Sequence, residues 1–423
     1  MVHPARNIAG ALRLPGDKSI SHRYAMLAAI AEGTTRLENF STGADCASTL
    51  KCLAGLGVAL EQNENAVLIH GRGPKLHPPR IPLDCGNSGS TMRMLSGILA
   101  GQEFSSELVG DESLSRRPMA RIITPLETMG AKIVAGDEGR PPLRISGTHL
   151  KSLEYKMPVP SAQVKSALLF AGLFAEGETR VEEPVRTRDH GELALRAFGA
   201  DVALSNNQAR IAGGQKLHSI EAEIPGDLSS AAFFLCAAAL FPGSRLLISG
   251  LLMNPTRAQL LDILVLMGVG ISVAELEDKH GELAGTVEVD GRDLRGATIA
   301  GADTAALIDE IPVLAAIAPY TSTGIEVRDA RELRVKESDR IASIATNLRA
   351  MGAEVEERED GLKIPGGQTL RGAELDSFGD HRIAMAFAVA ALRAEGETSI
   401  HRADAAVISC PGFFGALDAL SQR

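Results

Sequence analysis

The chain of 423 residues contains no Trp, and aromatic residues make up only 4% of it. Nucleobases and sugars usually stack on aromatic side chains, so a stacking platform is not expected here. An excess of positive charge is also missing, because the formal net charge is -10. General affinity for nucleic acid or for an anionic membrane needs clustered positive charge. We therefore expect neither partner, and any anion-binding site must be local.

Paired cysteines and long apolar runs are absent as well. The 5 Cys residues are an odd number without closely spaced pairs, which is typical of reduced cytosolic thiols and argues against a disulfide or metal framework. The N-terminal sequence MVHPARNIAG lacks the basic segment and apolar run of a secretory signal. No stretch of about 18 uncharged apolar residues could span a bilayer. A cytoplasmic protein without a bound metal is expected.

A helix, a Gly and a strand follow one another repeatedly along the chain, which is long enough for two or more domains. We expect each Gly to end its helix in the left-handed conformation, and the alternating residues that follow to begin a strand. The copies are CLAGLGVAL from Cys52, PLETMGAKI from Pro125, LRAFGADV from Leu195, LVLMGVGI from Leu264 and LRAMGAEV from Leu348, with a truncated copy, GALDAL, from Gly415. This local folding unit carries no chemistry by itself.

The two halves of the chain also begin alike, since Pro-Gly-Asp starts at both Pro15 and Pro225. We interpret this as a duplication with three units in each half, in which the two Pro-Gly segments cross between globular domains. The expected domains are an N-terminal lobe, residues 15–225, and a C-terminal lobe, residues 1–14 plus 226–423.

Polar residues at several helix starts depart from the repeated pattern. In the first half they are Lys18, Ser19 and Arg23 in LPGDKSISHR, Asn87, Gly89 and Arg93 in DCGNSGSTMRML, Arg116, Arg117 and Arg121 in GDESLSRRPMARI, and Ser161, Gln163, Arg186, Arg188 and His190 in VPSAQVKSALLF and RTRDHGE. A helix N-terminus favours phosphate or carboxylate, and Arg binds either in bidentate fashion. The alternatives of a solvated Lys, a simple turn and surface Arg side chains remain open.

The densest cluster of charge lies in the second half. It comprises Asp309 and Glu310 in IDEIPVLAAIA, then Arg334, Lys336, Glu337, Asp339 and Arg340 in one helix start, LRVKESDR, and finally Asp380, His381 and Arg382 in FGDHRIAMAFAVAAL. The carboxylates could cap helices, and the charge run could be a solvated face. We expect all these helix starts to converge on one cleft between the domains.

In their order from Leu14 to the C-terminus, these motifs resemble the 5-enolpyruvylshikimate-3-phosphate synthases, and the forms SAQVKSA, RTRDH, MNPTR and LRVKESDR are similar to the second bacterial class. The resemblance implies an α/β (α+β) fold of two domains built from inverse βαβαββ repeats, six in all and three per domain. It also implies a transferase of the shikimate pathway to chorismate and aromatic amino acids. Such an enzyme moves the enolpyruvyl group of phosphoenolpyruvate onto the 5-hydroxyl of shikimate 3-phosphate and releases phosphate.

The resemblance assigns roles to matching positions. It implies that shikimate 3-phosphate is bound by Lys18, Ser19, Arg23, Ser161, Ala162, Gln163, Arg188, Asp309 and Lys336. It implies that phosphoenolpyruvate is bound by Lys18, Asn87, Gly89, Arg117, Gln163, Glu337, Arg340 and Arg382. Among these, Lys18, Asp309 and Glu337 are the catalytic candidates: Asp309 accepts the proton of the attacking hydroxyl and Glu337 protonates the methylene. No cofactor is implied, and a monomer is expected.

Some positions depart from the family pattern. Where many members have a C-terminal active-site Lys, the sequence VISCPGFF offers Ile408 or Ser409. The family is the target of glyphosate; Gly89 indicates sensitivity, whereas the second bacterial class indicates tolerance. The related transferase that acts on UDP-N-acetylglucosamine commonly uses a loop Cys, and residues 110–118 contain none, although Cys85 and Cys410 lie near other motifs. A non-catalytic repeat scaffold is the remaining alternative.

Overall fold

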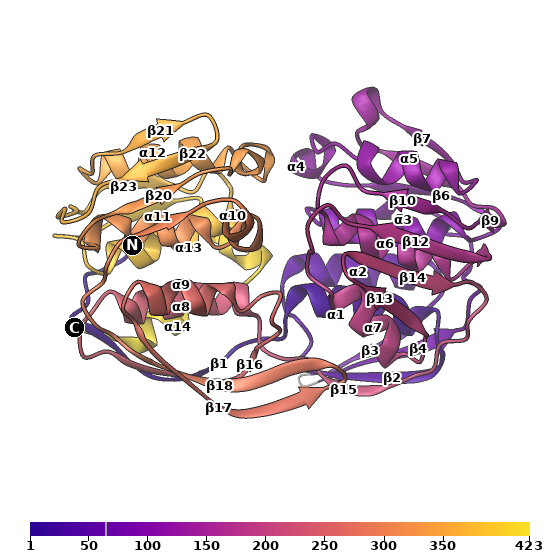
Figure 1. Cartoon of the computed structure of the whole chain (residues 1–423), viewed down its shortest axis with the longest axis horizontal. Helices are drawn as coiled ribbons and strands as arrows, with labels where there is room; N and C mark the ends of the chain where they lie inside the picture. The colour runs from indigo at the N-terminus through magenta and orange to yellow at the C-terminus, as the bar shows by residue number, and fades with distance from the viewer. Residues whose placement is uncertain (64–65) are drawn as a thin grey trace. The chain divides into compact units, whose positions relative to one another are not determined.

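The computed structural model describes residues 1–63 and 66–423, and the chain divides into two compact units (Figure 1). Unit 1 comprises Met1–Pro15, Pro225–Glu277 and Leu283–Arg423, and unit 2 comprises Gly16–Ile224 and Asp278–Glu282. The chain therefore changes unit near Pro15 and Pro225, and again at the tip of a β-hairpin. The tip, 278–282, belongs to unit 2, which differs from the expected C-terminal lobe of residues 1–14 plus 226–423.

The sheets of unit 2 repeat one design, in which a parallel pair of strands is followed by two antiparallel strands. The first has the order β15 (Glu221–Glu223), β2 (Glu32–Glu38), β4 (Ala66–Arg72), β3 (Ala59–Gln62). The second has the order β5 (Leu83–Asp84), β6 (Ser105–Val109), β8 (Leu143–Ser146), β7 (Lys132–Ala135). The third has the order β10 (Glu154–Lys156), β12 (Glu178–Glu182), β14 (Gln208–Ala212), β13 (Val202–Ser205), and β9 (Leu150–Lys151) pairs with β11 (Ala175–Glu176).

The core of unit 2 is formed by apolar helices that these sheets cover (Figure 1). The helices are α1 (Lys18–Ala29), α2 (Ala44–Gly55), α3 (Gly89–Ala100), α4 (Glu112–Ser115), α5 (Ala120–Thr128), α6 (Ala162–Gly172) and α7 (His190–Ala197), with a 3-10 helix, η1 (Asp137–Gly139). A Cβ on Gly97 in α3 would lie only 2.0 Å from the Ala167 carbonyl oxygen in α6. Glycine and alanine are therefore needed where these two helices touch.

Unit 1 has the same parallel-then-antiparallel design in a five-stranded sheet and a four-stranded sheet. The five-stranded sheet has the order β17 (Gly270–Lys279), β18 (Glu282–Asp290), β16 (Arg245–Leu252), β1 (Asn7–Arg13), β25 (Ser421–Gln422). The four-stranded sheet has the order β19 (Ala297–Ile299), β20 (Ile325–Val327), β22 (Gly361–Ile364), β21 (Glu356–Arg358), and β23 (Glu374–Asp376) pairs with β24 (Ser399–His401). Because β1 pairs with β16, the N-terminal strand is part of unit 1.

Three helices of unit 1, α8 (Leu228–Ala239), α11 (Ile311–Ile317) and α13 (His381–Ala391), are buried along their whole length. The other helices are α9 (Gln259–Leu266), α10 (Ala302–Leu307), α12 (Arg340–Ala350) and α14 (Phe413–Leu420), with the 3-10 helices η2 (Ala318–Tyr320), η3 (Arg331–Val335) and η4 (Ala403–Ile408). In the part of the chain that the structure describes, no helix is long and apolar enough to cross a membrane.

The expected left-handed glycines are confirmed. Each follows a helix with a positive φ, which a residue with a Cβ adopts only at a cost. They are Gly57 (φ 82°), Gly130 (φ 114°), Gly199 (φ 92°), Gly268 (φ 97°) and Gly352 (φ 91°). A strand follows each one, at β3, β7, β13, β17 and β21. The truncated copy lacks this Gly, and α14 leads directly into β25.

Candidate functional site

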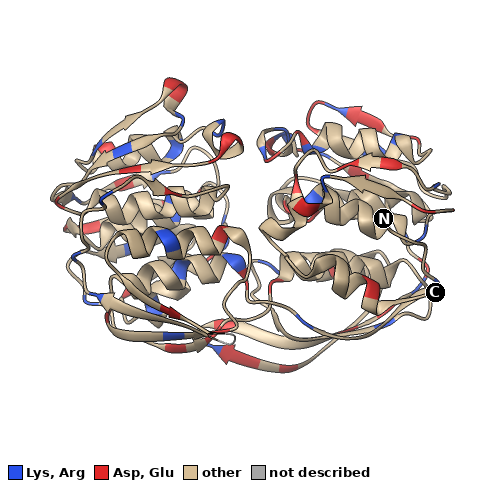
Figure 2. Ribbon diagram, turned by 180° about the vertical axis from the view of Figure 1, so that it is seen from behind, with Lys and Arg blue, Asp and Glu red and all other residues tan. Residues whose placement is uncertain are grey.

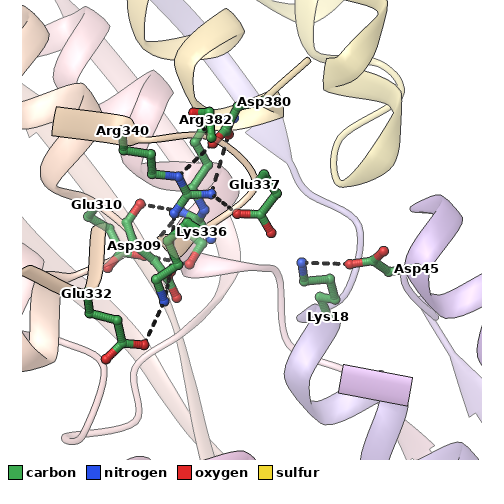
Figure 3. Close-up of polar contacts among 12 residues, drawn as sticks. Lys18, Asp45, Asp309, Glu310, Glu332, Lys336, Glu337, Arg340, Asp380 and Arg382 are labelled. Atoms are coloured by element: carbon green, nitrogen blue, oxygen red, sulfur yellow. Dashed lines mark hydrogen bonds and ion pairs between the residues drawn. The ribbon is translucent and has the colours of Figure 1, made fainter. Parts of the chain in front are cut away.

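The first candidate site lies in unit 2, at the start of α1. The Asp17 side chain caps the helix by accepting a hydrogen bond from the Ile20 backbone N–H at 2.9 Å. The next residue, Lys18, places its Nζ 3.0 Å from Asp45 Oδ2 at the start of α2, and its side chain is 22% exposed (Figure 3). Lys18 is thus a partly buried, paired cation rather than a solvated one.

Arg23 lies further along α1 and is only 3% exposed. Its Nε donates to Ser166 Oγ at 3.1 Å, and its terminal nitrogens donate to the carbonyl oxygens of Ser19 at 2.9 Å and Ala162 at 3.4 Å. Burial lowers the pKa of Arg23 to about 10, and the charge of Arg188 contributes in the same direction. Arg23 remains protonated at neutral pH and connects the starts of α1 and α6.

Gly89, the first residue of α3, lies beside two guanidinium groups. A Cβ at this position would be 2.9 Å from Arg93 NH1 and 3.5 Å from Arg117 NH1. Ser88 caps the helix with its side chain, and Arg117 NH2 donates to Asn87 Oδ1 at 2.9 Å. The absence of a side chain at Gly89 leaves the helix N-terminus and both cations close together, which suits an anion.

The start of α6 is bonded to the start of α3. Ser161 caps α6 by accepting from the Val164 backbone N–H at 3.4 Å. Gln163 accepts from Arg93 NH1 at 2.8 Å and donates to Ser90 Oγ at 2.9 Å. Together with the bonds of Arg23, these contacts join the predicted residues of α1, α3 and α6 in one polar network.

Other Arg and His residues that the sequence analysis singled out have structural partners elsewhere. The exposed Arg186 pairs with Asp189 at 3.0 Å. The His190 side chain is fully buried, with Nδ1 2.6 Å from Glu282 Oε1 at the hairpin tip, and this is one of the contacts that 278–282 makes in unit 2. The exposed Arg116 pairs with Glu112, four residues before it on α4.

The second candidate site lies in unit 1, around Arg340 at the start of α12. Arg340 is 1% exposed, and it donates from Nε to Asp380 Oδ2 at 2.8 Å and from NH2 to Glu337 Oε2 at 2.6 Å (Figure 3). Burial alone lowers the pKa of Arg340, but the carboxylates of Asp380 and Glu337 outweigh it and raise the pKa. In turn, burial raises the pKa of Asp380, but the charge and the hydrogen bond of Arg340, together with the charge of His381, outweigh it, so the pKa lies below its usual value.

Asp309 and Lys336 lie next to Arg340 and its two carboxylate partners. Asp309 Oδ1 is 3.8 Å from Lys336 Nζ and 3.7 Å from Arg340 NH1. Arg382 donates from NH1 to the backbone carbonyl of Asp309 at 2.5 Å. The side chains of Asp309 and Glu337 keep 20% and 16% exposure, so a ligand can reach both carboxylates. The cluster therefore holds two accessible acids among three cations, an arrangement suited to proton transfer on an anionic substrate.

Glu310 does not cap α11, so the capping alternative is wrong for this carboxylate. Its Oε1 accepts from Ser229 Oγ at 2.5 Å and lies 3.4 Å from Arg257 NH2 and 3.8 Å from Arg382 NH1. Glu310 and the Arg257 side chain are both buried. Glu310 thus contacts the guanidinium groups of both Arg257 and Arg382, and it restricts the position of the Arg382 side chain.

The segment LRVKESDR was predicted to be a single helix start, and this prediction is wrong. Arg334 belongs to η3, whereas α12 begins at Arg340 and is capped by Asp339, which accepts from the Ala342 N–H at 3.0 Å. Arg334 pairs with Asp339 at 2.8 Å and with Glu357 at 3.3 Å. The non-helical residues 336–339, between η3 and α12, place Lys336 and Glu337 beside Asp309 and Arg340.

Asp45, Ser229 and Arg257 were missed as partners of the site residues. Asp45 could have been suspected, because it also lies in the first turn of a helix. Ser229 follows the second Pro-Gly-Asp segment, and Arg257 belongs to MNPTR. Their contacts join residues far apart in the chain, so spacing alone gave no signal.

The two Cys residues near the motifs are packed thiols. Both are buried. Burial raises the pKa of Cys410 to about 12, and a hydrogen bond with Cys52 together with burial raises the pKa of Cys85. A thiol with a raised pKa is a poor nucleophile at neutral pH. Within residues 1–63 and 66–423, no group of three His, Cys, Asp or Glu side chains could hold a metal ion.

Comparisons with known proteins point in one direction. The family model described as EPSP synthase (3-phosphoshikimate 1-carboxyvinyltransferase) matches residues 2–417. The 3-phosphoshikimate 1-carboxyvinyltransferase of Koribacter versatilis is 59% identical over 423 residues, covering 100% of this chain and 99% of that protein. The one from Bacillus velezensis is 46% identical over 99% of this chain and 98% of its own length. The EPSP synthase structure from Acinetobacter baumannii aligns with a TM-score of 0.89 at 41% identity, over 100% of this chain and 97% of that one.

Proposed function

We infer that this chain, which belongs to the EPSP synthase (3-phosphoshikimate 1-carboxyvinyltransferase) family, is a transferase of the shikimate pathway to chorismate and aromatic amino acids. It transfers the enolpyruvyl group of phosphoenolpyruvate to the 5-hydroxyl of shikimate 3-phosphate and releases phosphate. The match over residues 2–417, at 59% identity to a relative of that name, carries this conclusion. The family is a glyphosate target, and because a Cβ at Gly89 would meet Arg93 and Arg117, this glycine is the position to examine for sensitivity.

The reaction needs an acid and a base. Protonation of the methylene carbon of phosphoenolpyruvate makes the adjacent carbon cationic, and the 5-hydroxyl attacks that carbon as it loses its proton. Loss of phosphate and of one proton from the tetrahedral intermediate then regenerates the enol ether. We propose Glu337 as the proton donor and Asp309 as the acceptor, and the partial exposure of both carboxylates, 16% and 20%, within one cluster supports this assignment.

Binding of the two anionic substrates is proposed for the remaining residues. The proposed contacts with shikimate 3-phosphate are Lys18, Ser19, Arg23, Ser161, Ala162, Gln163, Arg188, Asp309 and Lys336. The proposed contacts with phosphoenolpyruvate are Lys18, Asn87, Gly89, Arg117, Gln163, Glu337, Arg340 and Arg382. The hydrogen bonds of Arg23 and Gln163 and the ion pair of Lys336 with Asp309 support the first group. The contacts of Arg117 with Asn87 and of Arg340 with Glu337 support the second.

The finer architecture is also a proposal. We propose six inverse βαβαββ repeats, three per domain, with residues 15–225 as the lobe for shikimate 3-phosphate and residues 1–14 plus 226–423 as the other lobe. The order β5, α3, β6, α5, β7, β8 within one sheet and its packed helices supports this repeat. A cytoplasmic monomer that needs no cofactor completes the proposal. Charges of both signs are interspersed along both units (Figure 2), and the net charge of -10 gives no reason to expect a nucleic-acid partner.

A phosphate-release assay tests the function. With phosphoenolpyruvate and shikimate 3-phosphate together, we expect continuous phosphate release, and with either one omitted we expect none above the blank. Replacing shikimate 3-phosphate by UDP-N-acetylglucosamine tests the related transferase activity. Phosphate release with that acceptor alone would overturn the proposal, and no release with either acceptor would favour the scaffold alternative.

A further inference from the structure

The loop between β12 and α7, residues 183–189, carries Arg188 and is held from inside the unit. Its residues 184–186 are exposed, whereas Glu183 and Asp189 at its ends are buried. Arg188 is half-buried, and its charge affects the pKa of Arg23. A loop with an exposed middle needs fixed points if one of its side chains is to keep a defined direction.

The first fixed point is a buried ionic triad. Lys165, in the second turn of α6, places its Nζ 2.7 Å from Glu183 Oε2 and 2.8 Å from Glu192 Oε1 in α7. The three side chains are at most 4% exposed. Burying these charges costs desolvation energy that a well-packed apolar core would avoid, so the triad adds little to stability. What it provides is a defined geometry between α6, the loop and α7.

Glu183 also bonds to Thr187, the residue before Arg188, and so connects the triad to the loop. The Glu183 carboxylate accepts a hydrogen bond from the Thr187 hydroxyl, and its Oε2 accepts one from the Thr187 backbone N–H at 3.4 Å. Bonds to both the side chain and the backbone restrict the rotation of Thr187. The direction in which the next Cα–Cβ bond points, that of Arg188, is restricted with it.

The same two turns of α6 also hold other members of the network in unit 2. Gln163 accepts from Arg93, and Ser166 accepts from Arg23. Lys165 lies between them in the sequence, so one helix start determines the positions of three guanidinium groups: two by direct contact and one through Glu183 and Thr187.

We propose that Lys165, Glu183 and Thr187 are positioning residues that set Arg188 for the binding of shikimate 3-phosphate. This inference rests on the proposed function, because it assumes that Arg188 contacts that substrate. The residues act through Arg188 and touch neither substrate.

Thr187 offers the sharpest test, because Thr187→Val removes the hydroxyl at nearly constant volume, and Thr187→Ser keeps it. We expect Thr187→Val to raise the KM for shikimate 3-phosphate about tenfold, the usual effect of losing one hydrogen bond to a charged group. The KM for phosphoenolpyruvate should stay within twofold, and Thr187→Ser should restore most of the affinity. Thr128→Val is the matched control, since its exposed hydroxyl donates to the Thr124 carbonyl within its own helix at 2.9 Å.

A double-mutant cycle separates this inference from the proposed function. If Thr187 acts through Arg188, Thr187→Val should change the KM of an Arg188→Ala enzyme by less than twofold. An Arg188→Ala enzyme with a normal KM for shikimate 3-phosphate would remove the premise, the proposed role of Arg188. A raised KM in Arg188→Ala together with an unchanged KM in Thr187→Val would overturn the positioning role alone. Lower melting temperature and lower kcat in Thr187→Val, with both KM values unchanged, would reduce Thr187 to a structural residue and overturn it as well.

Discussion

At the scale of single residues, Arg340 controls the chemistry of its cluster because it contacts Glu337, Asp380 and Asp309 at once. We expect Asp309→Asn and Glu337→Gln each to lower kcat by about 10²- to 10⁴-fold, the usual effect of removing a general acid or base. Both amides are isosteric with the carboxylates, so binding of shikimate 3-phosphate should persist. Steady-state phosphate release and a thermal shift with shikimate 3-phosphate measure the two effects separately.

Glu326→Gln is the matched control for this prediction. Glu326 Oε1 lies 2.6 Å from Arg358 NH1 at 19% exposure, much as Glu337 lies 2.6 Å from Arg340 at 16%. Glu326 belongs to β20, outside the cluster around Arg340, so the kcat of Glu326→Gln should equal that of the wild type. A kcat within twofold of the wild type in both Asp309→Asn and Glu337→Gln would remove the proposed acid and base.

The residues of the candidate site could be predicted from the sequence more readily than their partners. Lys18, Gln163 and Asp380 were singled out because helix starts are visible in a local pattern of polar residues before an apolar run. The partner of Lys18 is 27 residues away, and that of Gln163 is 70 residues away. Such pairs are decided by how helices pack, and a single sequence does not encode packing in any spacing rule.

At the scale of elements, the glycine that ends each repeated helix has a cost that can be measured. A Cβ at Gly352 would meet nothing within 4 Å, so Gly352→Ala tests only the backbone, whose φ is 91°. The left-handed conformation should make this variant about 1 kcal/mol less stable. Gly415→Ala is the matched control, because Gly415 also faces open space but lies inside α14.

In Gly415→Ala the same methyl group should stabilise the helix by up to about 0.8 kcal/mol, since alanine favours helices over glycine. Urea unfolding of the two variants measures the difference. Equal midpoints for Gly352→Ala and Gly415→Ala would show that the positive φ at Gly352 does not matter for stability.

Elements were predictable wherever the signal was local. Helix, glycine and strand follow one another within about ten residues, and each copy was found because hydrophobic periodicity changes at the glycine. The division of LRVKESDR between η3 and α12 was missed, because Arg334 bonds to the carbonyl oxygens of Arg358 and Glu359. Those contacts with the end of β21 and the turn after it lie more than twenty residues along the chain and override the helical charge pattern.

At the scale of the whole molecule, the duplication that the two Pro-Gly-Asp segments suggested stays a prediction, and the structure shows two units whose sheets share a parallel-then-antiparallel strand order. No pattern in the sequence indicates that the hairpin tip 278–282 belongs to unit 2. The contacts of the tip with the rest of unit 2 include the buried pair of His190 and Glu282, 92 residues apart, and the contacts of Lys279 with Glu223 and of His280 with the Glu221 carbonyl. Neither His190 nor Glu282 has a helical or strand spacing that relates it to the other, so only the folded chain reveals the pair.

Acid should destabilise the molecule through His22, which is buried at the centre of unit 2. His22 Nδ1 lies 2.7 Å from Thr49 Oγ1, and burial, with help from the charges of Lys18 and Arg23 and against that of Asp45, lowers the pKa of His22 to about 3. Between the ordinary value of 6.5 and about 3, the unfolded chain binds a proton that the folded chain does not. Stability therefore falls as the pH falls through this window.

The expected loss from His22 is about 1.4 kcal/mol per pH unit below 6.5. His22→Asn keeps a polar atom near Thr49 but does not titrate. The slope of its unfolding free energy against pH should therefore be smaller than that of the wild type by about 1.4 kcal/mol per pH unit. Urea unfolding at pH 7, 6, 5 and 4, followed by circular dichroism, gives both slopes, and His149→Asn at an exposed histidine should leave the slope as in the wild type. A buried imidazole that stays neutral while the unfolded chain binds a proton must steepen the dependence of the unfolding free energy on pH. If His22→Asn and the wild type lost stability in parallel from pH 6 to pH 4, the acid sensitivity would therefore have to come from groups other than His22.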